Sequence, residues 1–149
     1  MKIREVALHN YRSIKDATFY VADYGLLIGA NNCGKTSVLD ALRSFYEKDI
    51  KFDQQRDFSK FPTDDKESWI EIEYEMTKDE ADSIKTEYRQ ARNRFRVRKV
   101  LQCDDKTKLH LFAYEGGALS QNRAGAEQAW RSFVDTIPIV GETGVQTSF

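Results

Sequence analysis

The sequence contains few prolines and cysteines and has no long apolar run. Among 149 residues there are two prolines and two cysteines, Cys33 and Cys103, a number that fits neither a disulfide framework nor a zinc site. The first ten residues, MKIREVALHN, carry early charges and no apolar core long enough for a signal peptide. No run approaches the roughly 18 apolar residues that a membrane-spanning helix needs. We therefore expect a reduced, cytoplasmic chain with no membrane partner.

Charge is also nearly balanced. Lysine and arginine number 23 and aspartate and glutamate 24, so the formal net charge is −1. A chain with this balance has no overall attraction to nucleic acid, and any contact with DNA must come from a local patch. With 40% hydrophobic and 32% charged residues, the composition is that of a single globular domain or lobe.

The most informative stretch is residues 26–37, LLIGANNCGKTS, which contains the pattern GxxxxGKT. In such a loop glycines let backbone N–H groups approach phosphates closely, the lysine reaches the β- and γ-phosphates, and the following hydroxyl binds Mg²⁺. The next helix adds its N-terminal N–H groups. The candidate nucleotide-binding residues are Gly29, Asn31, Asn32, Cys33, Gly34, Lys35, Thr36 and Ser37, with Thr36 as a metal ligand. The alternative is a plain glycine turn with Lys35 solvated.

The elements that flank this loop support the nucleotide-binding interpretation. Residues 24–28 are apolar and suit a buried strand, and apolar residues at helical spacing predict a helix over 36–46. Earlier in the chain, residues 2–9 and 17–22 predict two strands joined by a polar turn at 10–16. Three strands before the first long helix favour an α/β fold with a mixed sheet.

The second half of the chain predicts an antiparallel β subdomain with flanking helices. After a long polar connection over 47–66, residues 69–76 alternate as in a half-buried strand. Thr77 and Glu80 form a capping-box pattern that opens a helix running to about Asn93. Further strands are expected from 94 to about 101 and at 109–114, the latter in a hairpin ending at Glu115, Gly116 and Gly117, and a last helix over 124–135.

The densest positive run permits two interpretations. Arg94, Arg96 and Arg98 fall on one face of a predicted strand, where they could contact the phosphate backbone of DNA. If that strand pairs antiparallel with residues 69–76, the same arginines could instead face Glu71, Glu73 and Glu75 across the ladder. Cross-strand pairs of this kind contribute roughly 0.2–1 kcal/mol each, and we favour this second explanation.

Two linked motifs carry a resemblance to a known group of proteins. LHNYRSIKDATF, followed after a short gap by LIGANNCGKTSVLDAL, resembles the start of the ABC-type, P-loop ATPase heads of the SMC, SbcC, RecF and OLD families. Asn10, Tyr11, Arg12 and Ser13 match the pattern after the opening strand. The resemblance implies a P-loop NTPase lobe that binds ATP and Mg²⁺, with Arg12 beside the phosphates. It also implies a glutamine loop that contacts Mg²⁺, for which Gln146 is the candidate and Gln121 and Glu142 are competitors.

Two motifs of that group are absent from this sequence. There is no apolar strand ending in aspartate and glutamate, and no serine-glycine-glycine signature. We therefore expect residues 1–149 to be an N-terminal lobe whose catalytic residues are unknown and which is inactive alone. Its expected partners are the C-terminal lobe of the same ATPase and a second ATPase head that dimerises around ATP, with DNA as a further candidate. The implied roles are DNA repair, chromosome maintenance or phage defence; the alternative is a complete small P-loop interaction module without hydrolysis.

Overall fold

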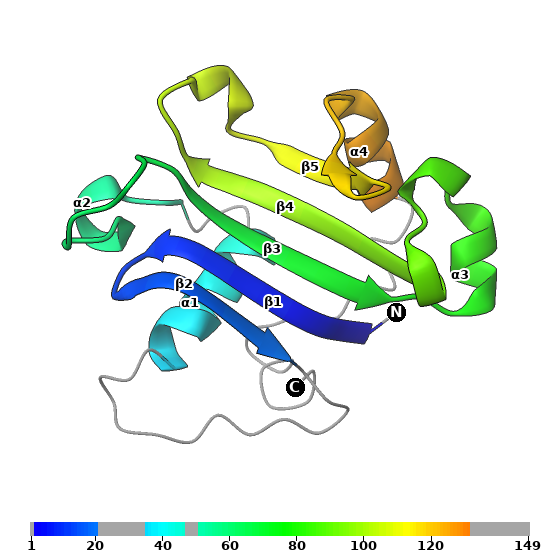
Figure 1. Cartoon of the computed structure of the whole chain (residues 1–149), viewed down its shortest axis with the longest axis horizontal. Helices are drawn as coiled ribbons and strands as arrows, with labels where there is room; N and C mark the ends of the chain where they lie inside the picture. Colours follow the sequence, from blue (N-terminus) through cyan, green and yellow to red (C-terminus); the bar gives the residue numbers. More distant parts are fainter. Residues whose placement is uncertain (1, 21–34, 47–50, 132–149) are drawn as a thin grey trace.

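An antiparallel sheet of six strands organises the computed structural model, which describes residues 2–20, 35–46 and 51–131 (Figure 1). The strand order is β2-β1-β3-β4-β5-β6, and every neighbouring pair is antiparallel. The strands are β1 (Lys2–Tyr11), β2 (Ile14–Tyr20), β3 (Ser68–Glu75), β4 (Arg94–Gln102), β5 (Leu111–Glu115) and β6 (Ala118–Leu119). The α/β class with an antiparallel β subdomain is thus confirmed, whereas the predicted strand at 24–28 lies outside the described residues.

Helices flank this sheet. They are α1 (Lys35–Tyr46), α2 (Gln54–Asp57), α3 (Lys78–Ser83) and α4 (Arg123–Arg131), with 3-10 turns at Thr86–Tyr88, Ala91–Asn93 and Lys106–Lys108. In Figure 1 α1 passes behind the strands, α2 lies near the turn of the β1–β2 hairpin, and α4 lies beside β5. Within the described ranges, no helix is both long and apolar enough to cross a bilayer.

The core lies between the sheet and helices α1 and α4. The predicted alternation of β3 is confirmed, because Ile70, Ile72 and Tyr74 are fully buried on the face that meets the helices. Trp130 of α4 reaches the same core, where its ring contacts that of Tyr74. Burying each large apolar side chain contributes roughly 1.5–3 kcal/mol, so this one-sided core holds α1 against the sheet.

The first hairpin is tighter than the sequence predicts. The polar segment 10–16 is not a long turn: β1 continues to Tyr11, β2 begins at Ile14, and only Arg12 and Ser13 form the turn. Tyr11 is 1% exposed and pairs with Ile14, so burial of its ring extends the ladder into the polar segment. Arg12 itself has a left-handed backbone, with φ of 54°.

The predicted helix from Thr77 to Asn93 is wrong beyond Ser83. The capping box of Thr77 and Glu80 is present, but α3 ends after six residues. Ile84 then takes an extended backbone and is buried, and the chain turns back through two 3-10 turns. The N–H of Met76 donates to the carbonyl of Asn93 at 2.8 Å, which brings the chain back to the end of β3 so that β4 can pair with it.

The face of the sheet away from α1 carries a ladder of charged side chains. The register places Glu71 opposite Arg98, Glu73 opposite Arg96 and Glu75 opposite Arg94, as expected for cross-strand pairing. Glu71 is 4% exposed and accepts from Arg96 at 2.7 Å and from Arg98 at 3.0 Å. Arg98 also lies over the ring of Trp69, 3.8 Å from its centroid. These arginines are therefore engaged with partners inside the protein.

A second polar cluster fastens the connection before β3 to the first hairpin. The two ring nitrogens of His9 lie 2.6 Å from Asp16 and 3.0 Å from Asp65. The His9 ring stacks on Trp69, and Asn10 donates to Asp65 at 2.9 Å. Burial alone would lower the pKa of His9, but the hydrogen bonds to both carboxylates raise it above its ordinary value of 6.5. The sequence gives no sign of this cluster, because Asp65 is 56 positions from His9.

Replacing Glu71 tests the charged ladder. Glu71→Gln removes the buried carboxylate shared by two arginines and should lower the free energy of unfolding by about 2 kcal/mol. Glu73→Gln is the matched control, because Glu73 is more exposed and lies 3.8 Å from Arg96, so its loss should cost less than about 0.5 kcal/mol. Urea denaturation of the two variants measures this difference. Equal effects would contradict the assignment of Glu71 as the centre of the ladder.

The His9 cluster predicts a pH-dependent contribution to stability. Because folding raises the pKa of His9, its protonated form stabilises the folded state fully below about pH 6.5, and this contribution is lost as pH rises through the folded pKa. His9→Gln should therefore lower the free energy of unfolding by about 0.5–1 kcal/mol at pH 6 and by almost nothing at pH 9. Urea titrations across this range measure the effect.

The same change at His110 is the control, because its Nδ1 lies 2.9 Å from the carbonyl oxygen of Leu111 and, among the described residues, its ring makes no hydrogen bond to a carboxylate. An effect of His9→Gln that stays constant from pH 6 to pH 9 would show that the imidazole acts by packing alone.

Candidate nucleotide-binding site

The described part of helix α1 runs from Lys35 to Tyr46, at the place where the predicted phosphate loop requires a helix. Lys35 and Thr36 are its first two residues, and their side chains lie outside the described part of the chain. Ser37, also in the first turn, is half-buried. The first turn of α1 contains no acidic residue. Its N–H groups and the positive end of its dipole are thus left without a negative side chain of their own turn, an arrangement that suits a phosphate.

Several predicted site residues cannot be placed. Gly29, Asn31, Asn32, Cys33, Gly34 and Gln146 lie outside the described residues. Their roles toward ATP and Mg²⁺ remain predictions. Within residues 2–20, 35–46 and 51–131, no group of three or more histidine, cysteine, aspartate or glutamate side chains could hold a metal ion.

The body of α1 is fixed at its buried face and at its C-terminus. Val38, Ala41, Leu42 and Phe45 recur at helical spacing and are all buried against the sheet. At the other end, Nζ of Lys99 on β4 donates to the carbonyl of Ser44 at 2.8 Å. Burial lowers the pKa of Lys99, but a cation at this place complements the negative end of the helix dipole. The start of α1 is therefore held in a defined position on the sheet.

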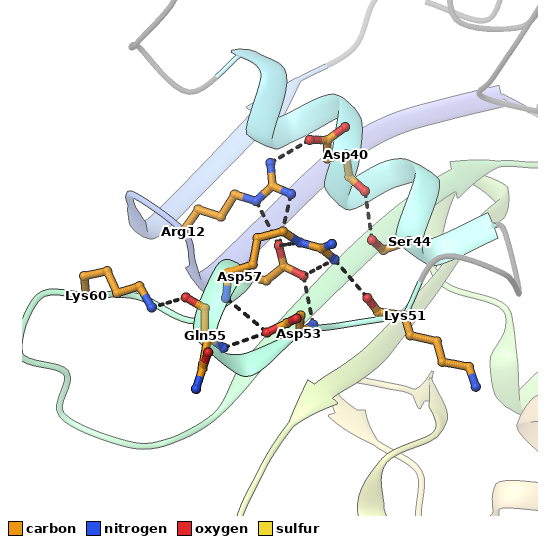
Figure 2. Close-up of polar contacts among 9 residues, drawn as sticks. Arg12, Asp40, Ser44, Lys51, Asp53, Gln55, Asp57 and Lys60 are labelled. Atoms are coloured by element: carbon orange, nitrogen blue, oxygen red, sulfur yellow. Dashed lines mark hydrogen bonds and ion pairs between the residues drawn. The ribbon is translucent and has the colours of Figure 1, made fainter.

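Arg12 links the first hairpin to α1 and α2 (Figure 2). Its Nη1 lies 2.6 Å from Oδ2 of Asp40 on α1, and its Nε and Nη2 each lie 3.0 Å from Oδ1 of Asp57 on α2. The backbone N–H of Arg12 also donates to the carbonyl of Asp57. Burial alone would lower the pKa of Arg12, but the bonds to these carboxylates raise it. The predicted phosphate ligand thus lies beside the loop's helix, held between two carboxylates.

Asp57 is the buried centre of this cluster. Its side chain has no exposed area, and it accepts from a second arginine as well, with Nε and Nη2 of Arg56 each at 2.9 Å. The backbone N–H of Asp53 adds a bond of 3.0 Å. Burial alone would raise the pKa of Asp57, but these donors outweigh it and lower the pKa. Two arginines and one backbone N–H therefore keep the carboxylate charged.

Sequence reasoning found Arg12 but missed its partners. Asp40 falls on the polar face of α1 and Asp57 lies in a connection that looks like an ordinary surface loop. One sequence feature that pointed to α2 was Asp53, a residue type that favours the start of a helix. Its side chain caps this short helix by accepting from the N–H groups of Gln55 and Arg56. That cap predicts a helical turn ending at Asp57, although not its burial.

A separate cavity lies elsewhere. It has a volume of about 150 Å³, and its lining includes Trp69, Arg98, Cys103 and Lys108. Because Trp69 and Arg98 belong to the face of the sheet away from α1, we do not assign this cavity to the nucleotide.

Comparison with known proteins identifies the family. The family model described as AAA ATPase domain matches residues 1–123. No curated protein matches at a significant level. Among solved structures, one from work on ATP-driven dimerisation and DNA-stimulated activation of SMC ATPases is 14% identical, with a TM-score of 0.55, and the match covers 93% of this chain and 86% of that chain.

The SMC head domain from Thermotoga maritima is also 14% identical, with a TM-score of 0.51, and the match covers 86% of this chain and 42% of that chain. At such low identity the two structures show a shared fold. The family match extends over the loop at 26–37, the helix that begins at Lys35 and the hairpin that carries Arg12. On this evidence the chain belongs to the AAA ATPase domain family and has the fold of SMC ATPase heads.

Proposed function

We propose that this chain is the ATP-binding lobe of an SMC-, RecF- or OLD-like ATPase that acts in DNA repair, chromosome maintenance or phage defence. The proposal rests above all on α1, which is described from Lys35 onward, follows the glycines of GxxxxGKT directly in the sequence, and has no acid in its first turn. Backbone N–H groups and the ammonium of Lys35 would hold the phosphates there. Membership of an ATPase domain family supports ATP as the nucleotide.

The residues around the loop fit Mg²⁺·ATP in their chemistry. Thr36 offers a hydroxyl oxygen, the hard ligand that Mg²⁺ prefers, and Gln146 would offer an amide oxygen. When bound, Mg²⁺ neutralises phosphate charge. Arg12 would contribute a guanidinium to the phosphates once it leaves its carboxylates, because guanidinium groups bind phosphate oxygens through two parallel N–H groups.

Hydrolysis would need groups that this sequence does not contain. The acidic strand end and the serine-glycine-glycine signature of this ATPase group are absent from residues 1–149. In our proposal a C-terminal lobe and a second head, brought together by ATP, supply them. The chain alone is therefore expected to bind ATP weakly and to turn it over negligibly.

DNA is a weaker part of the proposal. Arg94, Arg96 and Arg98 lie among Glu5, Glu71, Glu73 and Glu75, so these three arginines face four glutamates and the ladder carries no net positive charge. A DNA contact by the assembled ATPase would therefore more readily use a surface outside this ladder.

Replacing Lys35 tests the proposed site. Lys35→Ala should weaken binding of Mg²⁺·ATP by at least about tenfold, because a hydrogen bond to a charged group contributes roughly 1.5–3 kcal/mol. Isothermal titration calorimetry of the purified chain measures this affinity. Lys66→Ala, at an exposed lysine before β3, is the control for loss of one positive charge. Equal affinities of Lys35→Ala and the parent would refute the assignment of the loop.

Replacing Thr36 tests the metal separately. Thr36→Val keeps the shape of the side chain but removes the hydroxyl, so it should weaken binding of ATP in the presence of Mg²⁺ and change it little in excess EDTA. Competition with a fluorescent ATP analogue under both conditions measures the two affinities. A loss of the same size with and without Mg²⁺ would show that Thr36 does not ligate the metal.

A further inference from the structure

We propose that Asp40 and Asp57 hold Arg12 in a resting position, that ATP draws Arg12 away from them, and that Arg56 then keeps Asp57 paired. This inference rests on the proposed function, because Arg12 needs a bound phosphate to move to. In this proposal Asp40 competes with ATP for the guanidinium of Arg12. Arg56 is a positioning residue that acts through Asp57.

The guanidinium of Arg12 is already bound by two carboxylates. Its Nε and Nη2 contact Asp57 and its Nη1 contacts Asp40, all within 3.0 Å (Figure 2). A guanidinium grips a phosphate through two neighbouring N–H groups. In Arg12 the neighbouring pair Nε and Nη2 is already bound to Asp57, and Nη1 is bound to Asp40. Gripping a phosphate through Nε and Nη2 therefore requires Arg12 to give up Asp57, while Asp40 holds the third nitrogen in the resting position.

The Arg12–Asp40 pair lies close to the start of α1. Asp40 lies five residues after Lys35 on α1, which corresponds to about 7.5 Å along the helix axis. Arg12 therefore rests within one side-chain length of the start of α1. Asp40 is 32% exposed, so water can solvate its carboxylate when Arg12 leaves.

Arg12 must also leave Asp57, which has no exposed area. A buried carboxylate without a partner is strongly unfavourable. Here Arg56 already contacts both oxygens of Asp57, at 2.9 Å each, and the N–H of Asp53 adds a third bond. Because these partners stay in place, Arg12 can depart without stranding a buried charge.

The arrangement has a consequence for affinity. Where only a fraction of the molecules is in the binding-competent state, the apparent affinity is the intrinsic affinity multiplied by that fraction. Removing Asp40 weakens the resting position and raises the affinity for ATP. Removing Arg56 leaves Asp57 dependent on Arg12, strengthens the resting position and lowers the affinity. Two single changes outside the phosphate loop thus shift ATP binding in opposite directions.

The experiment measures Mg²⁺·ATP binding by calorimetry for Asp40→Asn and Arg56→Gln, each alone and combined with Arg12→Gln. Asp40→Asn should bind on the order of fivefold tighter and Arg56→Gln on the order of fivefold weaker than the parent. In the Arg12→Gln background, itself weaker than the parent, neither change should have any effect. Asp64→Asn, at a side chain that is 93% exposed, is the control for loss of one negative charge.

Each outcome decides the question. A gain from Asp40→Asn that persists in the Arg12→Gln background would show a direct charge effect on ATP and overturn the proposal. A loss from Arg56→Gln that persists there would do the same, since Arg56 would then act without Arg12. If neither variant changes binding while Lys35→Ala abolishes it, the resting position is wrong and the proposed function stands. No ATP binding by the parent at millimolar nucleotide would overturn both.

Discussion

The seating of α1 on the sheet is the constraint on which the proposed site depends. Four buried side chains, Val38, Ala41, Leu42 and Phe45, fix one face of the helix, and Lys99 binds the carbonyls at its C-terminus. Because the helix cannot slide or rotate without exposing this face, its first turn is held at one place relative to the first hairpin. A phosphate loop works only if the helix that follows it is anchored in this way.

Charge on the protein is distributed differently on the two faces of the sheet. The face away from α1 carries its arginines among glutamates, with Glu71 as the shared acceptor, so its positive charge is used for stability. At the hairpin end Arg12 is also paired, but its partners differ in kind: Asp40 is partly exposed, and Asp57 is buried with a second arginine in place. Because of that difference, we interpret the charged ladder as structural and propose that the cluster of Arg12, Asp40 and Asp57 responds to the nucleotide.

The fold was largely predictable because local patterns match the elements. Alternation in β3, the capping box at Thr77 and the helical spacing after Lys35 all correspond to the structure. The misses have tertiary causes: burial of Tyr11 tightens the first hairpin, and burial of Ile84 and Tyr88 with the return to β4 ends α3 early.

The candidate site was predictable only in part. A motif of adjacent residues identifies Lys35 and Thr36, and a linked motif points to Arg12. The partners of Arg12 come from positions 28 and 45 residues away, and no local pattern can show that two such carboxylates meet. The same holds for Asp65 beside His9. Ion pairs made by the fold, unlike motifs, need the structure.

In the proposed mechanism the start of α1 and Arg12 of the first hairpin respond together to ATP. An NMR titration of the ¹⁵N-labelled chain with Mg²⁺·ATP tests it most directly, because it follows the backbone amides and the Nε–H of Arg12 in one experiment. We expect the largest shifts at residues 29–38 and a saturable change of the Arg12 Nε–H signal at the same ATP concentration. Shifts confined to the face around Trp69 and Arg98, with the amides of Lys35, Thr36 and Ser37 unchanged, would contradict it.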